Sequence, residues 1–103
     1  MTRQQPEAKI VNAIIKALNA LPQTYVKKTH GSPYSVGWPD MIGVHRGVPI
    51  CLEAKTATGK ASARQLHELG KWEQAGAVVG IVRSVDEAMA VIEIIPPMTQ
   101  ALA

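Results

Sequence analysis

Residues 37–55 read GWPDMIGVHRGVPICLEAK, and this stretch holds the pattern from which the topology of the chain can be worked out. Two apolar, β-branched runs, 40–45 and 48–55, flank the dipeptide Arg46-Gly47. Two such runs around a two-residue connection are typical of a β-hairpin, because a tight turn matches the twist of the strands. We therefore expect two antiparallel strands joined at Arg46-Gly47.

Charged residues stand at the open end of this hairpin. Asp40 opens the first strand, and Glu53 and Lys55 end the second, where alternation sends both to one face and Ala54 to the other. Neighbouring strands lie about 4.8 Å apart, so Asp40 and Glu53 can converge on one cation. Two carboxylates and a strand carbonyl would form an oxygen-only site of the kind that Mg²⁺ or Mn²⁺ prefers. Alternatively, Asp40 is a turn residue and Glu53–Lys55 an ordinary ion pair.

The other elements follow from hydrophobic periodicity and from turn residues. They are expected, in chain order, as a helix near 6–20, a strand at 25–29, a loop at 30–38, a polar loop at 56–61, a helix from Ser62 to Ala75 that ends at Gly76, a strand at 77–82 and a helix from Ser84 to Ile95. Leu66, Leu69 and Trp72 should form the buried side of the second helix. Ser84 and Glu87 have the spacing of a capping box.

The order of elements is α-β-β-β-α-β-α, which predicts an α/β fold with a mixed β-sheet flanked by helices. The strand–helix–strand crossover over 48–83 implies a parallel pair of strands, expected at the centre of the sheet. A uniformly apolar strand at 77–82 should be fully buried. We interpret residues 1–103 as a single domain whose last residues, 96–103, form a tail after Pro96-Pro97.

Composition limits the class of protein. Of the 103 residues, 47% are hydrophobic and 18% charged, which is an ordinary globular balance. The formal net charge of +3 permits a polyanionic partner without establishing one. One cysteine, Cys51, excludes an intramolecular disulfide and a Cys-rich zinc site, and the three histidines lack zinc-ligand spacing and are expected on surfaces or loops. No run resembles a membrane span or a signal peptide, so we expect no membrane association and a cytoplasmic location.

Glu7 is a further candidate for the site. It precedes Ile10 and Val11 by three and four residues, so it should share their face of the first helix and point towards the core. A carboxylate in that position is costly unless a cation or hydrogen bonds satisfy it. Alternatively, Glu7 is a first-turn acid that the helix dipole favours.

Pro39-Asp40 followed by Glu53-Ala54-Lys55 resembles the motif of the PD-(D/E)xK nuclease superfamily, and within it the virus-type replication-repair nuclease (VRR-NUC) family. The resemblance covers nearly the whole chain and includes Glu7, residues 37–40, 53–55 and 59–62, Gln65 and Gly76. It implies a restriction-endonuclease-like fold and a metal-dependent DNA endonuclease that uses Mg²⁺, for which Mn²⁺ would substitute. The family includes small stand-alone phage and bacterial proteins, which implies the cytoplasm of a bacterium or of a phage-infected host cell.

The resemblance also implies roles for individual residues. Asp40 and Glu53 would hold the metal with the backbone carbonyl of Ala54, and Glu7 would bind a metal-bound water or a second metal. Lys55 would orient or help deprotonate the attacking water and offset charge on the phosphate.

Gln65 is open to two interpretations. The resemblance implies that it positions Lys55 and the scissile phosphate, whereas Ser62-Ala63-Arg64-Gln65 also has the spacing of a capping box. The candidate DNA contacts, each of which is otherwise a surface or loop residue, are Lys27, Lys28, His30, Tyr34, Lys60 and Arg64.

Stand-alone members of the family resemble dimeric four-way-junction resolvases, which implies a homodimer acting on branched DNA, either a four-way junction or a flap. The third helix and the strand around Tyr25 are the candidate dimer surfaces. Two alternatives stay open: a DNA-binding or assembly subunit that has the nuclease fold but does not cut, and an RNA-directed nuclease of the same fold.

Overall fold

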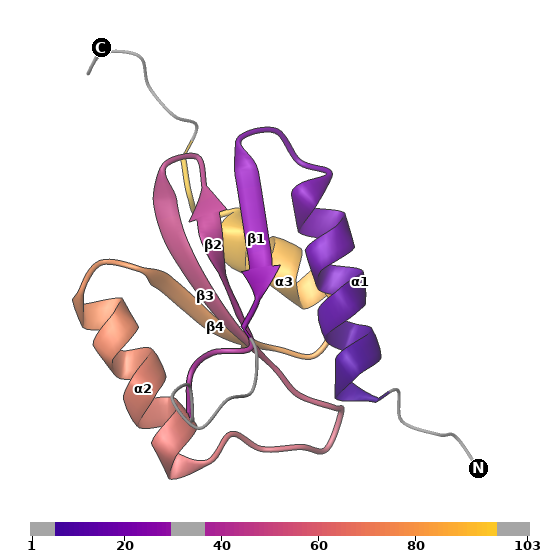
Figure 1. Cartoon of the computed structure of the whole chain (residues 1–103), viewed down its shortest axis with the longest axis vertical. Helices are drawn as coiled ribbons and strands as arrows, with labels where there is room; N and C mark the ends of the chain where they lie inside the picture. Colours follow the sequence, from indigo (N-terminus) through magenta and orange to yellow (C-terminus); the bar gives the residue numbers. More distant parts are fainter. Residues whose placement is uncertain (1–5, 30–36, 97–103) are drawn as a thin grey trace.

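The computed structural model describes residues 6–29 and 37–96, and its elements follow the predicted order α-β-β-β-α-β-α (Figure 1). They are α1 (Glu7–Asn19), β1 (Thr24–Lys28), β2 (Met41–His45), β3 (Val48–Ala54), α2 (Ala63–Gln74), β4 (Val78–Val82) and α3 (Val85–Ile92). The predicted fold class, a mixed sheet flanked by helices, is therefore confirmed. The single-domain interpretation stays a prediction, because residues 97–103 of the expected tail lie outside the described residues.

The four strands form one sheet in the order β1-β2-β3-β4, in which β1, β2 and β3 are antiparallel neighbours and β4 is parallel to β3. The prediction that the parallel pair lies at the centre is wrong, because β4 is an edge strand of the described sheet. The prediction of a fully buried strand is also wrong, since only Val82 of β4 is buried. An edge strand has a neighbour on one side alone, so solvent reaches its flank.

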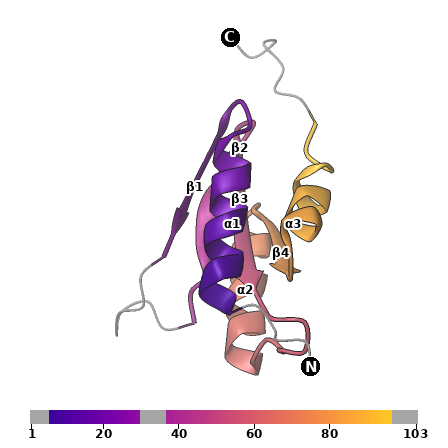
Figure 2. The same cartoon turned by 90° about the vertical axis from the view of Figure 1, so that its right-hand side faces the viewer.

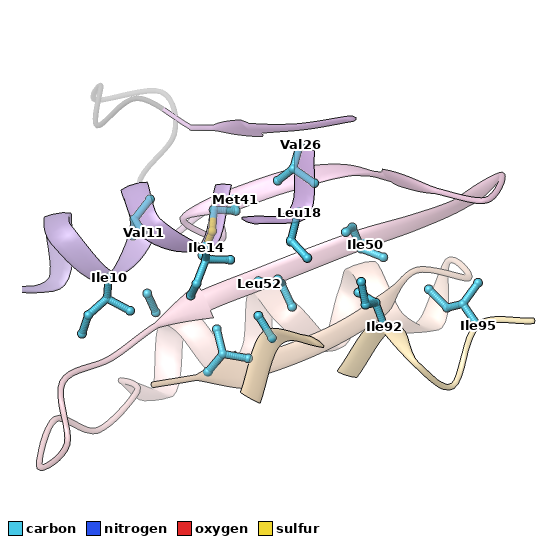
Figure 3. Packing of buried hydrophobic residues seen from close by; sticks show 13 residues of the cluster. Ile10, Val11, Ile14, Leu18, Val26, Met41, Ile50, Leu52, Ile92 and Ile95 are labelled. Atoms are coloured by element: carbon cyan, nitrogen blue, oxygen red, sulfur yellow. The ribbon is translucent and has the colours of Figure 1, made fainter. Parts of the chain in front are cut away.

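One face of the sheet is covered by α1 and α3, which pack side by side (Figures 1 and 2). The amphipathic helix α1 buries Ile10, Val11, Ile14 and Leu18, the helical stripe that the sequence predicts. These side chains meet Val26, Met41, Ile50 and Leu52 from β1, β2 and β3, and Ala88, Ile92 and Ile95 from the C-terminal segment (Figure 3). This larger core holds β2 and β3 in place beside the helices.

The opposite face is only partly covered, because α2 packs over β3 and β4. Leu69 of α2 meets Cys51 and Ala77 in a smaller core, with Trp72 partly buried against it. Leu66 is 51% exposed, so the prediction that it is buried is wrong. Leu66 belongs to the first turns of α2, and the start of this helix extends beyond the end of the sheet (Figure 1).

The ends of α2 and α3 are capped by their own sequence. Ser62 and Gln65 form a reciprocal capping box at the start of α2, and Gly76, with φ +111°, follows its last turn as predicted. At α3, Ser84 Oγ accepts the Glu87 N–H, but the Glu87 carboxylate accepts from Arg83 N (2.9 Å). The first half of the expected box is therefore present, and in the second half the Glu87 carboxylate accepts from Arg83 N in place of Ser84 N.

His45 ends β2 in a buried position, so the prediction that it is a surface or loop residue is wrong. Its Nδ1 lies 2.7 Å from Thr24 Oγ1 of β1, and its side chain is 5% exposed. Burial, and then the charge of Arg46, lower its pKa.

None of the helices in the described part of the chain is long and apolar enough to cross a membrane.

Gly43 of β2 leaves no room for a side chain against the β1 backbone, and we expect Gly43→Ala to destabilise the fold strongly. A methyl group there would lie 2.2 Å from Tyr25 O and 2.6 Å from Val26 Cα, both backbone atoms that a side-chain rotation cannot move. Overpacking of this severity should lower the free energy of unfolding by about 3 kcal/mol. Urea denaturation followed by circular dichroism measures it.

Gly70→Ala is the matched control, because Gly70 lies inside α2 and a methyl group there meets nothing within 4 Å. Its free energy of unfolding should rise by about 1 kcal/mol through helix propensity. Equal midpoints for Gly43→Ala and the unchanged protein would contradict the β1–β2 register described here.

Candidate functional site

Asp40 and Glu53 come together at one end of the sheet. Met41 pairs with Leu52 in the antiparallel register, so the residues that precede and follow them, Asp40 and Glu53, face each other. Two cross-strand hydrogen bonds fix the pair: Asp40 N donates to Glu53 Oε1 (3.1 Å), and Ala54 N donates to Asp40 Oδ2 (2.9 Å). On the other side, Thr29 N donates to Asp40 O (2.9 Å). The backbone thus fixes both carboxylates at neighbouring positions.

Glu53 is buried at a cost to its charged form. Its side chain is 1% exposed, and its Oε2 is a buried oxygen with no hydrogen-bond partner. Burial, and next the charge of Asp40, raise the pKa of Glu53 to about 7, although the Asp40 N–H and the Lys55 ammonium act in the opposite direction. A buried, unpartnered carboxylate oxygen beside a second carboxylate is the environment that a divalent cation would satisfy.

Lys55 follows β3 directly and is 9% exposed. Its backbone N–H donates to Val82 O (3.0 Å), which extends the parallel pairing with β4 by one residue. Alternation along the strand therefore places its side chain on the same face as that of Glu53. The carboxylate pair and the lysine stand together, as the spacing Glu53-Ala54-Lys55 predicts.

Glu7 is exposed, so the prediction that it points towards the core is wrong. It begins α1, whose buried stripe starts only at Ile10, so the first turn of the helix precedes the part that packs in the core. Among residues 6–29 and 37–96, no three Asp, Glu, His or Cys side chains form a group that could hold a metal ion. The start of α1 lies at the end of the molecule where the loop after β3 runs (Figure 1). The catalytic role of Glu7 stays a prediction.

Gln65 forms the capping box that the sequence left open as an alternative. The Gln65 side-chain Oε1 accepts from Ser62 N (2.9 Å), and the Gln65 backbone N–H donates to Ser62 Oγ (3.1 Å). The side chain is half-buried at the start of α2. Its carbonyl oxygen is therefore engaged in the helix cap, and its role in the site stays a prediction.

The candidate DNA contacts differ in what the structure says of them. Lys27, Lys28, Lys60 and Arg64 are all exposed. The Arg64 side chain lies over Gly37, since a Cβ built on that glycine would be 3.3 Å from Arg64 Cγ. His30 and Tyr34 lie outside the described residues.

Sequence reasoning missed Arg83, which directly follows β4. Its Nη1 donates to two backbone carbonyls in the loop after Lys55, those of Thr56 and Gly59, the second at 2.7 Å. The signal was present in the sequence: a lone cation ends an apolar strand, at the position that continues the β3–β4 register opposite Lys55. The predicted crossover would have paired the two residues.

Two solved structures have folds similar to that of this chain. A solved structure described as "VRR_NUC domain" matches with a TM-score of 0.71 and 26% sequence identity, covering 87% of this chain and 97% of that one. A second, described as "VRR_NUC domain protein", matches with a TM-score of 0.74 and 11% identity, covering 94% and 95%. No protein-family model matches the sequence. No curated protein matches it either.

The raised pKa of Glu53 predicts a stability that falls as the pH rises. A carboxyl whose pKa is higher in the folded than in the unfolded state stabilises the fold in its protonated form. For Glu53, with an ordinary pKa of 4.5, this contribution is complete below about pH 4.5 and is lost as the pH rises through about 7. Glu53→Gln carries no charge to desolvate. In EDTA, its Tm should exceed that of the unchanged protein by at least about 5 °C at pH 8, and by much less at pH 4.5.

Differential scanning fluorimetry at pH 4.5, 6, 7 and 8 measures the difference, with the exposed Glu73→Gln of α2 as the control substitution. A Tm for Glu53→Gln that stays below that of the unchanged protein at every pH would show that Glu53 is not held at a cost.

Proposed function

We propose that this chain, a protein with the VRR-NUC fold, is a metal-dependent endonuclease that hydrolyses phosphodiester bonds in structured DNA, either a four-way junction or a flap. The observation that carries the proposal is the facing pair Asp40 and Glu53, one of whose oxygens, Glu53 Oε2, is buried without a partner. In a nuclease-type fold, a carboxylate kept at such a cost supports a functional role.

The donor set suits a hard divalent cation. Asp40 and Glu53 would hold Mg²⁺ or Mn²⁺ together with the backbone carbonyl of Ala54, and all of these ligands are oxygens. When bound, the cation would supply Lewis-acid polarisation of the phosphodiester and activation of the attacking water. The protein side of the site is already arranged, because backbone hydrogen bonds fix both carboxylates.

The remaining residues would act on the phosphate and on the water. Lys55, on the face of Glu53, would donate to a non-bridging phosphate oxygen and orient the attacking water. Gln65 Oε1 accepts from Ser62, so Gln65 Nε2 would be its donor towards the phosphate. Glu7 would bind a second cation or its water from the first turn of α1.

The charge pattern suits a polyanionic substrate such as DNA. The formal net charge is +3, and four of the positively charged side chains are exposed candidates for phosphate contacts. They are Lys27 and Lys28 of β1 and Lys60 and Arg64 around the start of α2. Lys28 precedes Thr29, whose N–H bonds to Asp40 O, so the end of β1 adjoins the carboxylates. Phosphates on either side of the cut bond would contact these side chains.

We further propose that two copies associate through the sheet face that α2 leaves uncovered. Tyr25, Val44 and Pro49 pair across β1, β2 and β3 in one row on this face. Tyr25 is 63% and Val44 46% exposed. An apolar face of this kind marks an interaction site, and a two-fold pair of active sites would match the symmetry of a junction.

Cutting of labelled four-way-junction, flap and linear duplex DNA tests the activity. We expect cleavage of the branched DNAs in Mg²⁺ or Mn²⁺ and none in EDTA. Asp40→Asn, Glu53→Gln and Lys55→Met should each lower the rate by at least about 100-fold, because the first two remove charged ligands of the proposed cation and the third removes the proposed donor to the phosphate.

The matched controls are Asp86→Asn, Glu73→Gln and Lys71→Met, which change the same residue types at exposed positions on α2 and α3. They should cut within about twofold of the unchanged protein, as surface substitutions do. Cleavage that persists in EDTA would refute the metal mechanism, and binding without cutting in either metal would refute the nuclease.

The dimer proposal predicts that Val44→Lys converts a dimer into a monomer. A lysine at the centre of the apolar row would bring like charges together across a two-fold interface. Sedimentation velocity at micromolar concentration measures the mass. Ile94→Lys is the control: Ile94 is 72% exposed just after α3, the other candidate surface, and its substitution should leave the dimer intact. A monomeric unchanged protein, or a monomer from Ile94→Lys alone, would contradict this choice of face.

A further inference from the structure

We infer that Arg83 is a positioning residue, which sets the place of Lys55 by closing the loop after it. This inference rests on the proposed function, in which Lys55 acts on the scissile phosphate. Ile50 pairs with Val78 and Ala54 with Val82, and continuing this parallel register places Arg83 beside Lys55. The Lys55 N–H bond to Val82 O (3.0 Å) extends the pairing to that point.

The guanidinium of Arg83 donates hydrogen bonds to backbone carbonyls of the loop after Lys55. Its Nη1 donates both to Thr56 O and to Gly59 O (2.7 Å). The same turn is closed from within, since Gly59 N donates to Thr56 O and to Thr56 Oγ1, each at 3.1 Å. Within the described residues the one ion pair joins Lys71 to Glu68, so Arg83 is not paired with a carboxylate. Its charge-assisted hydrogen bonds therefore stabilise the conformation of one turn, Thr56–Gly59.

This turn lies close to the lysine. A Cβ built on Gly59 would be 3.7 Å from Lys55 Cδ, which is van der Waals distance, so the turn runs beside the aliphatic part of the Lys55 side chain. A side chain that is 9% exposed, held between its strand and this turn, can direct its ammonium in few ways. If the two carbonyls were released, the turn could open and Lys55 would gain other orientations.

Arg83 is itself fixed from the other side. Its backbone N–H donates to Glu87 Oε1 (2.9 Å) in the first turn of α3, while Ser84 Oγ caps the same turn by accepting from Glu87 N (3.1 Å). The start of α3 therefore holds the arginine at the end of β4. A continuous chain of contacts runs from α3 through Arg83 and the Thr56–Gly59 turn to Lys55.

The test measures Lys55 directly as well as through activity. Arg83→Met keeps the aliphatic stem and removes both hydrogen bonds, whereas Arg83→Lys can reach one carbonyl. Acetic anhydride labelling followed by peptide mass spectrometry gives the acetylation rate of each lysine without requiring catalysis. We expect the rate at Lys55 to rise about tenfold in Arg83→Met and less in Arg83→Lys, with the rate at Lys71 unchanged.

Nuclease kinetics provide the second measurement. Arg83→Met should lower kcat by at least about tenfold with KM within about twofold, because a misplaced group weakens the chemical step more than binding. Arg83→Lys should restore part of kcat. In a Lys55→Met background, Arg83→Met should have no further effect on kcat, since the residue it positions is gone. Lys71→Met is the matched control for loss of a surface cation.

The outcomes separate this inference from the proposed function. Unchanged labelling of Lys55 in both Arg83 variants would overturn the positioning role, even if the protein is a nuclease. Faster labelling of Lys55 together with no cutting by the unchanged protein in either metal would support the positioning and refute the nuclease. Equal acceleration at Lys71 and Lys55 in both variants would reveal general loosening and overturn the inference.

Discussion

The register between β2 and β3 is the constraint on which the site depends. Asp40 faces Glu53 only because Met41 pairs with Leu52, and a slip of one residue would turn either side chain to the other face. The turn at the far end sets this register: Arg46 and Gly47 both have positive φ, 51° and 82°, as a two-residue hairpin turn requires. Two residues that never touch the site therefore decide which carboxylates meet in it.

The carboxylate pair is held against its own electrostatics. Backbone N–H groups supply one hydrogen bond to each carboxylate, which fixes geometry but leaves Glu53 Oε2 without a partner. No described residue forms a salt bridge with Glu53, although the positive charge of Lys55 lowers the cost of its charged form. Local conflicts of this kind concentrate where a protein keeps a function at the expense of stability. Among the described residues, Glu53 Oε2 is the one buried side-chain nitrogen or oxygen atom that has no hydrogen-bond partner.

The sequence was informative where periodicity and local chemistry act alone. The stripe of α1 and the Arg46-Gly47 turn are local features, and both formed as predicted. The Ser62–Gln65 cap, one of the two interpretations of Gln65, is also local and is present. The errors concern where an element ends relative to its neighbours. Leu66 has the helical spacing of a core residue but lies on a turn beyond the sheet, and Glu7 precedes the buried part of α1. β4 is as apolar as a central strand, yet lies at an edge.

The candidate site followed a similar division. Asp40, Glu53 and Lys55 could be predicted because strand alternation and pairing bring together residues that one short stretch of sequence contains. The position of Arg83 opposite Lys55 was open to the same reasoning, but its contacts were not, because they are to the main chain of Thr56 and Gly59 and backbone carbonyls carry no sequence signature. Main-chain groups do much of the holding at this site, through Asp40 N, Ala54 N and those two carbonyls. A site organised by backbone atoms constrains few side chains, so its geometry can persist while most of the surrounding sequence changes.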